Sequence, residues 1–318
     1  MRNKASLLVV VLLLLAGVAW LTHAKLGGPP LTEGDESRPD IQRFVSDSHR
    51  EQLYRIAWTG DTMLGAQGAK VLKREGLDYP FRKVESLLKQ ADYAIGNSEA
   101  PITKRKKKNN PERKWSYNTK PKAAQVFADA GFNAMGLANN HTFDRGEKGI
   151  RDTRRHLKKV GMEMFGAGLD RQEAARPLLI NTPHGVVGVV GIQRKNPNVP
   201  SAKKRRAGTL RLGPKTIAKA YKTAIAAGAR WVVAYVHWGA NYEGIKGHQK
   251  RYAREFAKAG FDLVVGHGSH TPQMVSSVGD MPVFYSLGNF VFTTPGRFKH
   301  YDVNHLGYGL IAHTFLGP

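Results

Sequence analysis

Two adjoining stretches decide the fold: Leu53-Tyr54-Arg55-Ile56-Ala57-Trp58, and directly after it Gly60-Asp61-Thr62-Met63-Leu64-Gly65. The first stretch is short, largely apolar and free of turn residues, which predicts a buried strand. The second places a carboxylate between two glycines just beyond that strand. Open α/β sheets bind their ligands at the carboxyl ends of the strands, so Asp61 is a candidate site residue.

The same arrangement, an apolar run followed by polar residues, recurs along the chain. Tyr93-Ala94-Ile95 precedes Asn97-Ser98-Glu99-Ala100-Pro101, and the predicted strand 133–138 precedes Asn139-Asn140-His141-Thr142-Phe143-Asp144. Three later polar stretches are His237-Trp238-Gly239, Gly266-His267-Gly268-Ser269-His270 and Ser286-Leu287-Gly288-Asn289-Phe290.

Amphipathic segments between these runs predict helices, which makes the chain an α/β protein. The predicted helices cover residues 81–90, 122–130, 146–160, 214–227 and 248–259. The remaining predicted strands cover residues 231–236, 262–265, 283–286 and 308–315, and a predicted hairpin joins 178–181 to 186–191 through Pro183-His184-Gly185.

Each polar residue at a strand end has an ordinary structural explanation. Asp61 fits a helix cap, Glu99 a surface acid and His237 a buried, hydrogen-bonded histidine. Together they form a different pattern, because carboxylate, amide and imidazole groups at successive strand ends are the ligands that Zn, Mn and Fe prefer. The chain has no cysteine, so a metal must be bound through oxygen and imidazole nitrogen. The sequence therefore predicts a site for one or two divalent metal ions, and it shows neither a Ser-His-Asp arrangement nor a P-loop.

The N-terminal region predicts a protein of the cell envelope. Arg2 and Lys4 precede an apolar run, residues 5–21, in the order of an export signal. Thr22-His23-Ala24 is a poor cleavage site, so we expect residues 1–24 to be an uncleaved helical membrane anchor rather than a cleaved signal peptide. Residues 25–51 are a predicted linker, and residues 52–318 a predicted domain. The domain would then lie outside the cytoplasm, in the periplasm or the extracellular space.

The charge of the chain indicates an anionic partner. Lys and Arg number 49 against 25 Asp and Glu, a formal net charge of +24, which attracts nucleic acid, anionic lipid or an acidic cell-surface polymer. Export favours the last two, and no aromatic-rich motif accompanies the basic runs, so we expect no nucleic-acid partner. The runs 104–108 and 203–206 lie in predicted loops, where they either attract an anionic polymer or are simply solvated.

The six polar stretches, in this order, resemble the CapA family of capsule-synthesis proteins, which is linked to poly-gamma-glutamate. The resemblance covers about residues 52–315. That family in turn resembles the calcineurin-like metallophosphoesterases. The resemblance therefore implies a metallo-dependent phosphatase-like fold, a four-layer α/β/β/α sandwich, with a dinuclear metal site. It also implies capsule synthase subunits as partners.

The resemblance implies a role for each candidate ligand. Asp61 and His270 would bind the first metal, and Glu99, or alternatively Asn97, would bridge the two ions. The ligands of the second metal would be Asn140, His237 and His267.

The same resemblance places a general acid at His141, with Asp144 orienting it. The chain also departs from the superfamily pattern at three points. Met63 stands where an Asp-x-His motif has its histidine, the bridging acid lies in an Asn-x-Glu motif, and His267 and His270 are three residues apart instead of two. The first metal site thereby loses a ligand.

Two functions remain open at this stage, both in capsule or cell-wall polymer synthesis or export. One is a metal-dependent hydrolase or transferase, which the retention of His141 beside Asn140 favours. The other is a non-catalytic accessory that binds a polyanion, which the loss of the histidine at Met63 favours.

Overall fold

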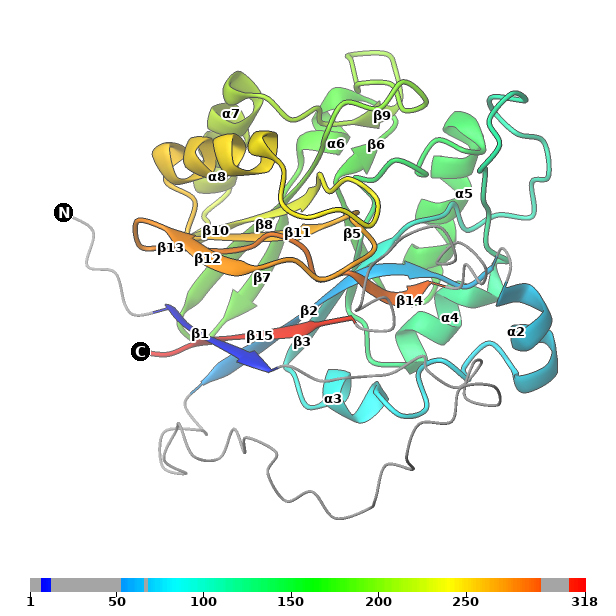
Figure 1. Ribbon diagram of the computed structural model, residues 1–318, viewed down its shortest axis with the longest axis horizontal. Helices are drawn as coiled ribbons and strands as arrows, with labels where there is room; N and C mark the ends of the chain where they lie inside the picture. The colour runs from blue at the N-terminus through cyan, green and yellow to red at the C-terminus, as the bar shows by residue number, and fades with distance from the viewer. Residues whose placement is uncertain (1–6, 13–52, 66–67, 293–308) are drawn as a thin grey trace.

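Two β-sheets packed face to face form the centre of the computed structural model, which describes residues 7–12, 53–65, 68–292 and 309–318 (Figure 1). The strands of the first sheet, in spatial order, are β1 (Leu7–Leu12), β15 (Ile311–Leu316), β2 (Tyr54–Met63), β3 (Tyr93–Ser98), β4 (Ala134–Gly136) and β5 (Glu163–Phe165), with β14 (Asn289–Phe292) also paired to β2. Those of the second are β12 (Val275–Val278), β13 (Met281–Phe284), β11 (Leu263–His267), β10 (Trp231–His237), β8 (Gly185–Gln193) and β7 (Leu178–Thr182). A separate short ladder pairs β6 (Ala167–Gly168) with β9 (Gly208–Thr209).

Helices cover the outer face of each sheet, as Figure 1 shows for α7 and α8 on one side and α3 on the other. On the first sheet lie α2 (Ala69–Glu75), α3 (Glu85–Lys89), α4 (Lys122–Asp129) and α5 (Gly146–Lys159); on the second lie α6 (Arg171–Ala175), α7 (Pro214–Ala226) and α8 (Gly247–Ala259). The predicted four-layer α/β/β/α sandwich is therefore confirmed.

Three buried apolar clusters fill the three spaces between these layers. Trp58 and Ile95 of the first sheet meet Val233 and Tyr235 of the second in the central cluster. The cluster under α7 and α8 joins them to the outer face of the second sheet. Strands between two apolar layers are apolar on both faces, which explains the continuous hydrophobic run of residues 231–236.

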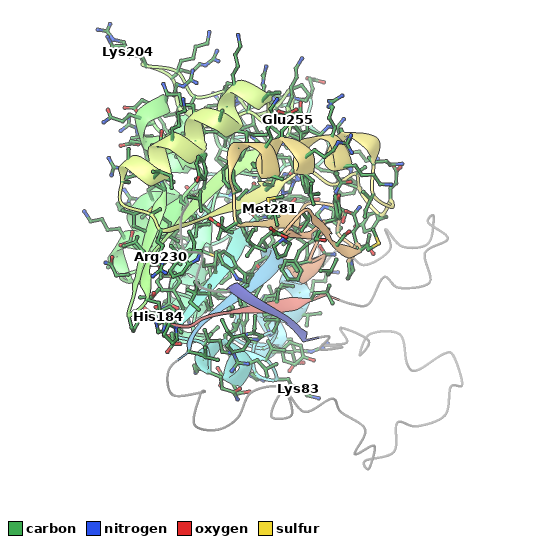
Figure 2. All side chains as sticks on the ribbon, turned by 90° about the vertical axis from the view of Figure 1, so that its left-hand side faces the viewer. Lys83, His184, Lys204, Arg230, Glu255 and Met281 are labelled. Atoms are coloured by element: carbon green, nitrogen blue, oxygen red, sulfur yellow. The ribbon has the colours of Figure 1, made fainter. Side chains whose placement is uncertain are left out.

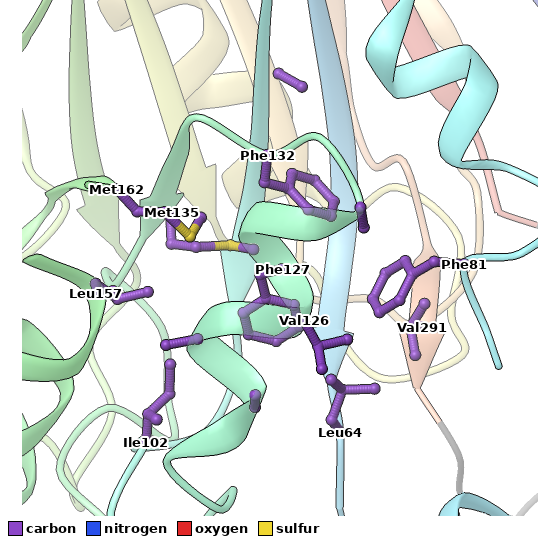
Figure 3. Packing of buried hydrophobic residues seen from close by; sticks show 14 of the residues in the cluster. Leu64, Phe81, Ile102, Val126, Phe127, Phe132, Met135, Leu157, Met162 and Val291 are labelled. Carbon is purple, nitrogen blue, oxygen red and sulfur yellow. The ribbon is translucent and has the colours of Figure 1, made fainter. Parts of the chain in front are cut away.

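The third cluster packs α2–α5 against the first sheet, and Figure 3 shows its centre. Phe81 makes edge-to-face contacts with Phe127 and Phe132, with ring centroids 6.1 and 6.2 Å apart. Val291 of β14 and Leu64 belong to the same cluster. Burial of each of these aromatic rings contributes about 1.5–3 kcal/mol to folding, so this packing holds β14 and the end of β2 in place.

One edge of β2 is shared by two strands. β15 pairs antiparallel with residues 54–59, and β14 pairs in parallel with residues 61–63, so that Asn289 lies opposite Asp61. Gly60 lies at the changeover, where an added Cβ would collide with the carbonyl oxygen of Gly288. The changeover brings a polar residue from the end of the chain beside Asp61.

Most predicted elements are present, and the differences concern short elements. The predicted hairpin around Pro183-His184-Gly185 is confirmed as β7 and β8. The predicted helix 81–90 is helical only at Glu85–Lys89. The elements that were not predicted are α2, α6, β5, β6, β9, β12 and β14, because two to seven residues are too few to display a period. The polar stretch 286–290 was expected to follow the predicted strand 283–286, but its last residues, Asn289 and Phe290, begin a further strand, β14.

The structure describes only part of the predicted anchor and none of the predicted linker. Leu7–Leu12, within the predicted anchor 1–24, form the strand β1, which pairs antiparallel with β15, so at these six residues the expected helix is not found. Residues 13–51 lie outside the described residues, as does the start of the predicted strand at 308. Among the residues described, no helix has the length and apolar character needed to cross a membrane.

One buried histidine lies on β15, the strand that pairs with residues 54–59 of β2. His313 is fully buried, and its Nδ1 accepts a hydrogen bond of 3.0 Å from Nε of Arg55. Burial, together with the positive charge of Arg55, lowers the pKa of His313 to about 3. The folded protein therefore holds this imidazole neutral, whereas the unfolded chain protonates it near pH 6.5, at about its ordinary pKa.

We expect His313 to weaken the folded state in acid. As the pH falls from about 6.5 towards the folded pKa, the unfolded chain binds a proton that the folded protein rejects. The free energy of unfolding then decreases by up to about 1.4 kcal/mol per pH unit. His313→Gln keeps an acceptor for Arg55 but does not titrate. Urea unfolding at about pH 7.5 and about pH 5 should show the wild type losing about 2 kcal/mol more than His313→Gln. Equal losses in both proteins would contradict this assignment.

Candidate metal centre

The carboxyl ends of strands from both sheets meet at one place. Asp61 lies near the end of β2 and Glu99 directly after β3, while His237 and His267 are the last residues of β10 and β11. His270 follows in the next loop with a φ of 61°, a left-handed conformation that non-glycine residues rarely adopt. All five side chains are buried. The structure thus brings together the five carboxylate and imidazole residues that the sequence analysis proposed as ligands.

Asp61 is the centre of this group. Its Oδ1 accepts a hydrogen bond of 2.8 Å from Nδ2 of Asn97 and lies 3.2 Å from Nδ1 of His267. Its Oδ2 accepts one of 3.1 Å from the backbone of Gly268 and lies 3.3 Å from Nδ1 of His270. Gly268 has a φ of 95°, and an added Cβ would stand 2.8 Å from the ring of His237. Only glycine therefore allows this backbone to approach the carboxylate.

Two overlapping groups of side chains have the spacing of a metal site. Asp61, His237 and His267 form one, and Asp61, Glu99 and His270 form the other; in each, the ligand atoms lie within 4.8 Å of one another. Asp61 is common to both groups. The resemblance instead implies that Glu99 bridges the two ions and that Asp61 binds only one of them. The structure differs from that expectation, because the carboxylate common to both groups is that of Asp61.

The two buried carboxyl groups have pKa values shifted in opposite directions. Burial raises the pKa of Asp61, but the hydrogen bonds and charges of His267 and His270 outweigh it and hold the pKa well below its ordinary value. Burial and the negative charge of Asp61 raise the pKa of Glu99 well above its ordinary value. Burial, followed by the neighbouring His267, lowers the pKa of His237. The imidazole of His237 is therefore neutral, which is the form that binds metal.

Several polar atoms at this place fit a metal ion. Within the described part of the chain, both carboxylate oxygens of Glu99 and Nε2 of His267 are buried without a hydrogen-bond partner. A buried polar atom without a partner costs about 1–3 kcal/mol, more when it is charged. A divalent cation would satisfy these atoms and favour the ionised form of Glu99. These buried Asp, Glu and His groups fit a metal site.

His141 and Asp144 form a hydrogen-bonded pair beside this group. Nδ1 of His141 lies 2.7 Å from Oδ2 of Asp144, which also accepts a hydrogen bond of 2.6 Å from the backbone N–H of Tyr117. Arg113 forms an ion pair with Oδ1 of Asp144 and donates a hydrogen bond of 3.0 Å to the carbonyl of Asn140. Burial lowers the pKa of His141 to about 4, against the opposing effect of Asp144. Asp144 therefore holds His141 in one tautomer, with the proton on Nδ1.

Sequence reasoning missed three residues of this arrangement. Arg113 lies in a basic loop in which nothing distinguishes it from its neighbours, so no signal could have found it. Oδ1 of Asn289 lies 2.9 Å from Nδ1 of His270, within hydrogen-bonding distance. The sequence offered one indication of this role, because Asn289 follows a glycine in the last polar stretch. Asn139 bonds to Oδ1 of Asn97 at 2.9 Å and so supports the partner of Asp61.

Met63 occupies the position where the superfamily pattern has a histidine, and the structure shows what replaces that ligand. Met63 is 1% exposed and packs with Ala100, Tyr117 and Phe292 in a small apolar cluster. The ring of Phe292 lies 4.5 Å from that of His270, and the ring of Tyr117 lies 4.5 Å from that of His141. An apolar wall therefore stands on this side of the site.

These layers and this buried donor set define an α/β/β/α protein with a candidate metal site between its two sheets. The chain belongs to the family described as "Bacterial capsule synthesis protein PGA_cap", whose model matches residues 55–294. This confirms the resemblance drawn from the six polar stretches.

Two similar proteins have names that refer to the biosynthesis of PGA or of a capsule. The chain is 30% identical over 265 residues to the "PGA biosynthesis protein CapA" of Bacillus subtilis, covering 81% of this chain and 67% of the relative. It is 33% identical over 252 residues to the "Capsule biosynthesis protein CapA" of Bacillus anthracis, covering 77% of this chain and 61% of the relative.

Similar solved structures include a putative 5'-nucleotidase from Staphylococcus aureus and a calcineurin-like phosphoesterase from Bacillus subtilis. The first has a TM-score of 0.49 at 13% identity and covers 83% of this chain and 54% of that one. The second has a TM-score of 0.45 at 11% identity and covers 84% of this chain and 91% of that one. Likenesses at this level do not bear on function.

We expect Arg113→Met to destabilise the protein strongly. The Arg113 side chain is 11% exposed and that of Asp144 is fully buried, so the substitution leaves a buried charge without its partner, at a cost of about 3–5 kcal/mol. The matched control is Arg151→Met, which removes an exposed pair with Glu147 worth at most about 1 kcal/mol. Urea unfolding of both variants measures the difference. Losses of equal size would show that Arg113 is an ordinary surface residue.

Proposed function

We propose that this protein acts in the assembly or export of an anionic cell-surface polymer of the poly-glutamate type, through a metal-dependent, hydrolase-like site. The buried group of carboxylates and imidazoles around Asp61 is the observation that carries the proposal. A protein that only binds polymer has no need of such a costly buried arrangement. The names of the two CapA relatives support the process.

In this proposal six side chains hold the divalent ion or ions, which we take to be Mn, Zn or Fe: Asp61, Glu99, Asn140, His237, His267 and His270. A bound ion supplies Lewis-acid polarisation of a phosphoryl or carbonyl oxygen. Asn97 and the backbone of Gly268 hold the Asp61 carboxylate through hydrogen bonds, so its orientation does not depend on the ion alone. Because burial lowers the pKa of His237, its neutral imidazole is ready to bind a metal ion without losing a proton.

His141 carries the proton in this proposal. Its Nδ1 bonds to Asp144, which leaves Nε2 to exchange a proton with the reacting group. A pKa of about 4 keeps the ring neutral at pH 7, and an anionic ligand beside it favours the protonated form that acts as an acid. Arg113 and the backbone of Tyr117 keep Asp144 in place, so the ring keeps its orientation between turnovers.

A non-catalytic accessory role is the second candidate function. The apolar packing of Met63 favours it, because the superfamily pattern has a ligand there. In this case the metal centre holds the polymer-binding face in shape and the protein assists a synthase. The two candidates differ in whether the polymer function needs the proton on His141.

Replacing His141 and His237 separately should distinguish the two candidates. His237→Ala removes a ligand, so we expect loss of metal and lower thermal stability together. His141→Ala should keep the metal and the fold, because the residue stands beside the ligands. An enzyme should lose turnover by about 10²–10⁴-fold when it loses a general acid.

The measurements are metal content and complementation of a deletion strain by each variant. Failure of His141→Ala to complement, with full metal content, supports the enzyme. Complementation by His141→Ala but not by His237→Ala supports the accessory. Full metal and full function in both variants would defeat the proposal itself.

We also propose that the protein is exported and held at the membrane, with residues 52–318 outside the cytoplasm and synthase subunits as neighbours. The support is the basic start and the apolar run 5–21, and in this proposal Leu7–Leu12 exchange their pairing with β15 for the membrane. Protease added to intact spheroplasts should then degrade the domain, while a cytoplasmic marker protein survives. Survival of the domain until the cells are lysed would place it in the cytoplasm.

A further inference from the structure

The two basic runs of the sequence belong to loops that meet at one cleft in the fold. A hydrogen bond of 3.0 Å from Nδ2 of Asn110 to Oδ1 of Asn198 joins the two loops. The cleft at this junction has a volume of about 500 Å³, within the range of about 300–1,000 Å³ usual for ligand sites. Figure 2 shows Lys204, at the tip of one loop, projecting into solvent at the end of the molecule opposite Lys83.

Both loops are strongly positive. Residues 104–114 carry seven Lys or Arg and one acid, and residues 194–211 carry seven and no acid. The fold pairs two of these cations with acids from α5 and its N-terminal turn: Arg105 with Asp152 at 2.9 Å, and Arg113 with Asp144. The remaining charges of the two loops repel one another across the cleft. An anionic ligand between them reduces this repulsion, so the fold favours a polyanion at this place.

The wall of the cleft combines amide and guanidinium groups: Asn109, Asn110, Asn196, Asn198, Arg206 and Arg211. An asparagine side chain offers a donor and an acceptor, as a peptide group does. A guanidinium group binds a carboxylate through two parallel hydrogen bonds. A site for a chain of phosphates needs cations alone, whereas this wall suits a polymer that carries both amide and carboxylate groups.

The cleft adjoins the candidate metal centre. Phe143, which lies between His141 and Asp144, lines it, and the backbone N–H of Asn109 bonds to the carbonyl of Asp144 at 3.0 Å. The basic loop 104–114 contributes both Asn109 to the cleft and Arg113 to the His141–Asp144 pair. A ligand in the cleft therefore touches the same segment that positions His141.

We propose that this cleft is the binding site for the polymer, and that its ligand is a carboxylate-bearing polyamide, a poly-glutamate strand, held beside His141. The assignment rests on the proposed function, because it names the ligand of that site. Arg211, whose side chain is exposed, binds carboxylate groups of the strand. The asparagines bind its amide groups.

Binding of fluorescent poly-glutamate to the full chain, measured by anisotropy, tests the assignment. Arg211→Gln removes one charge-assisted hydrogen-bonding group and should weaken binding about tenfold or more. Its control is Arg254→Gln, the same change at an exposed position on α8, which should bind within about twofold of the wild type. Equal weakening by both variants would mean that binding depends only on the total positive charge of the protein. That result would overturn the assignment of the cleft as the binding site.

A second variant fills the cleft without changing any charge. Ser201 lines it, and its carbonyl, which accepts from Arg206 at 2.8 Å, is kept in Ser201→Trp. This variant should also weaken binding about tenfold or more, and Ser277→Trp, at an exposed position on β12, should not. Unfolding curves confirm that each variant is folded before binding is compared. Binding by Ser201→Trp equal to that of Ser277→Trp would exclude the cleft.

Competition with inorganic polyphosphate of the same charge tests the class of ligand. Poly-glutamate should compete at least about tenfold better, because the asparagines match its amide groups. Equal competition would overturn the polyamide assignment. Metal content separates this inference from the proposed function: Arg211→Gln should keep the metal content of the wild type while it binds poly-glutamate weakly. Weak binding that goes together with loss of metal would overturn the cleft as an independent site.

Discussion

The carboxylate of Asp61 is the interaction on which the site depends. It is buried at the end of β2, yet it stays ionised, because imidazoles, an amide and a backbone N–H from both sheets surround it. A charge in the interior is tolerated only with such partners. The two sheets must therefore pack in one relative position, with His267 of β11 within hydrogen-bonding distance of Asp61 of β2. The central apolar cluster between the sheets maintains that position.

The two buried carboxyl groups of the site, Asp61 and Glu99, differ in their hydrogen bonding. Glu99 has a raised pKa and both carboxylate oxygens without partners, whereas Asp61 has a lowered pKa and is fully bonded. Asp61 thus connects the groups of the site through its hydrogen bonds, and Glu99 has the free acceptor atoms that fit a cation. The pair His141 and Asp144 lies on a separate segment, held by Arg113 from the basic loop. The same loop reaches the cleft, so the proposed polymer binding and the proposed proton transfer share one support.

Much of the fold follows from local patterns in the sequence. The apolar runs at 53–58 and 231–236 are strands, and the long amphipathic segment 146–160 is α5, as predicted. Short elements could not be predicted from local patterns. β14, for example, has only four residues and begins directly after Gly288, whose φ is 72°. The run 5–21 shows a second limit: hydrophobicity alone does not decide between helix and strand, and Leu7–Leu12 pair with β15.

The sequence by itself determined which residue types stand at the strand ends, and hence the chemistry of the candidate site. This was possible because a strand's end and its next few residues are adjacent in the chain, so a local pattern records them. Only the tertiary structure decided that Asp61, not Glu99, is shared by both groups of side chains, that Arg113 holds Asp144, and that two distant basic loops meet at Asn110 and Asn198. The physical reason is that these contacts join residues dozens to hundreds of positions apart. The packing of two sheets sets such distances, and no local pattern encodes them.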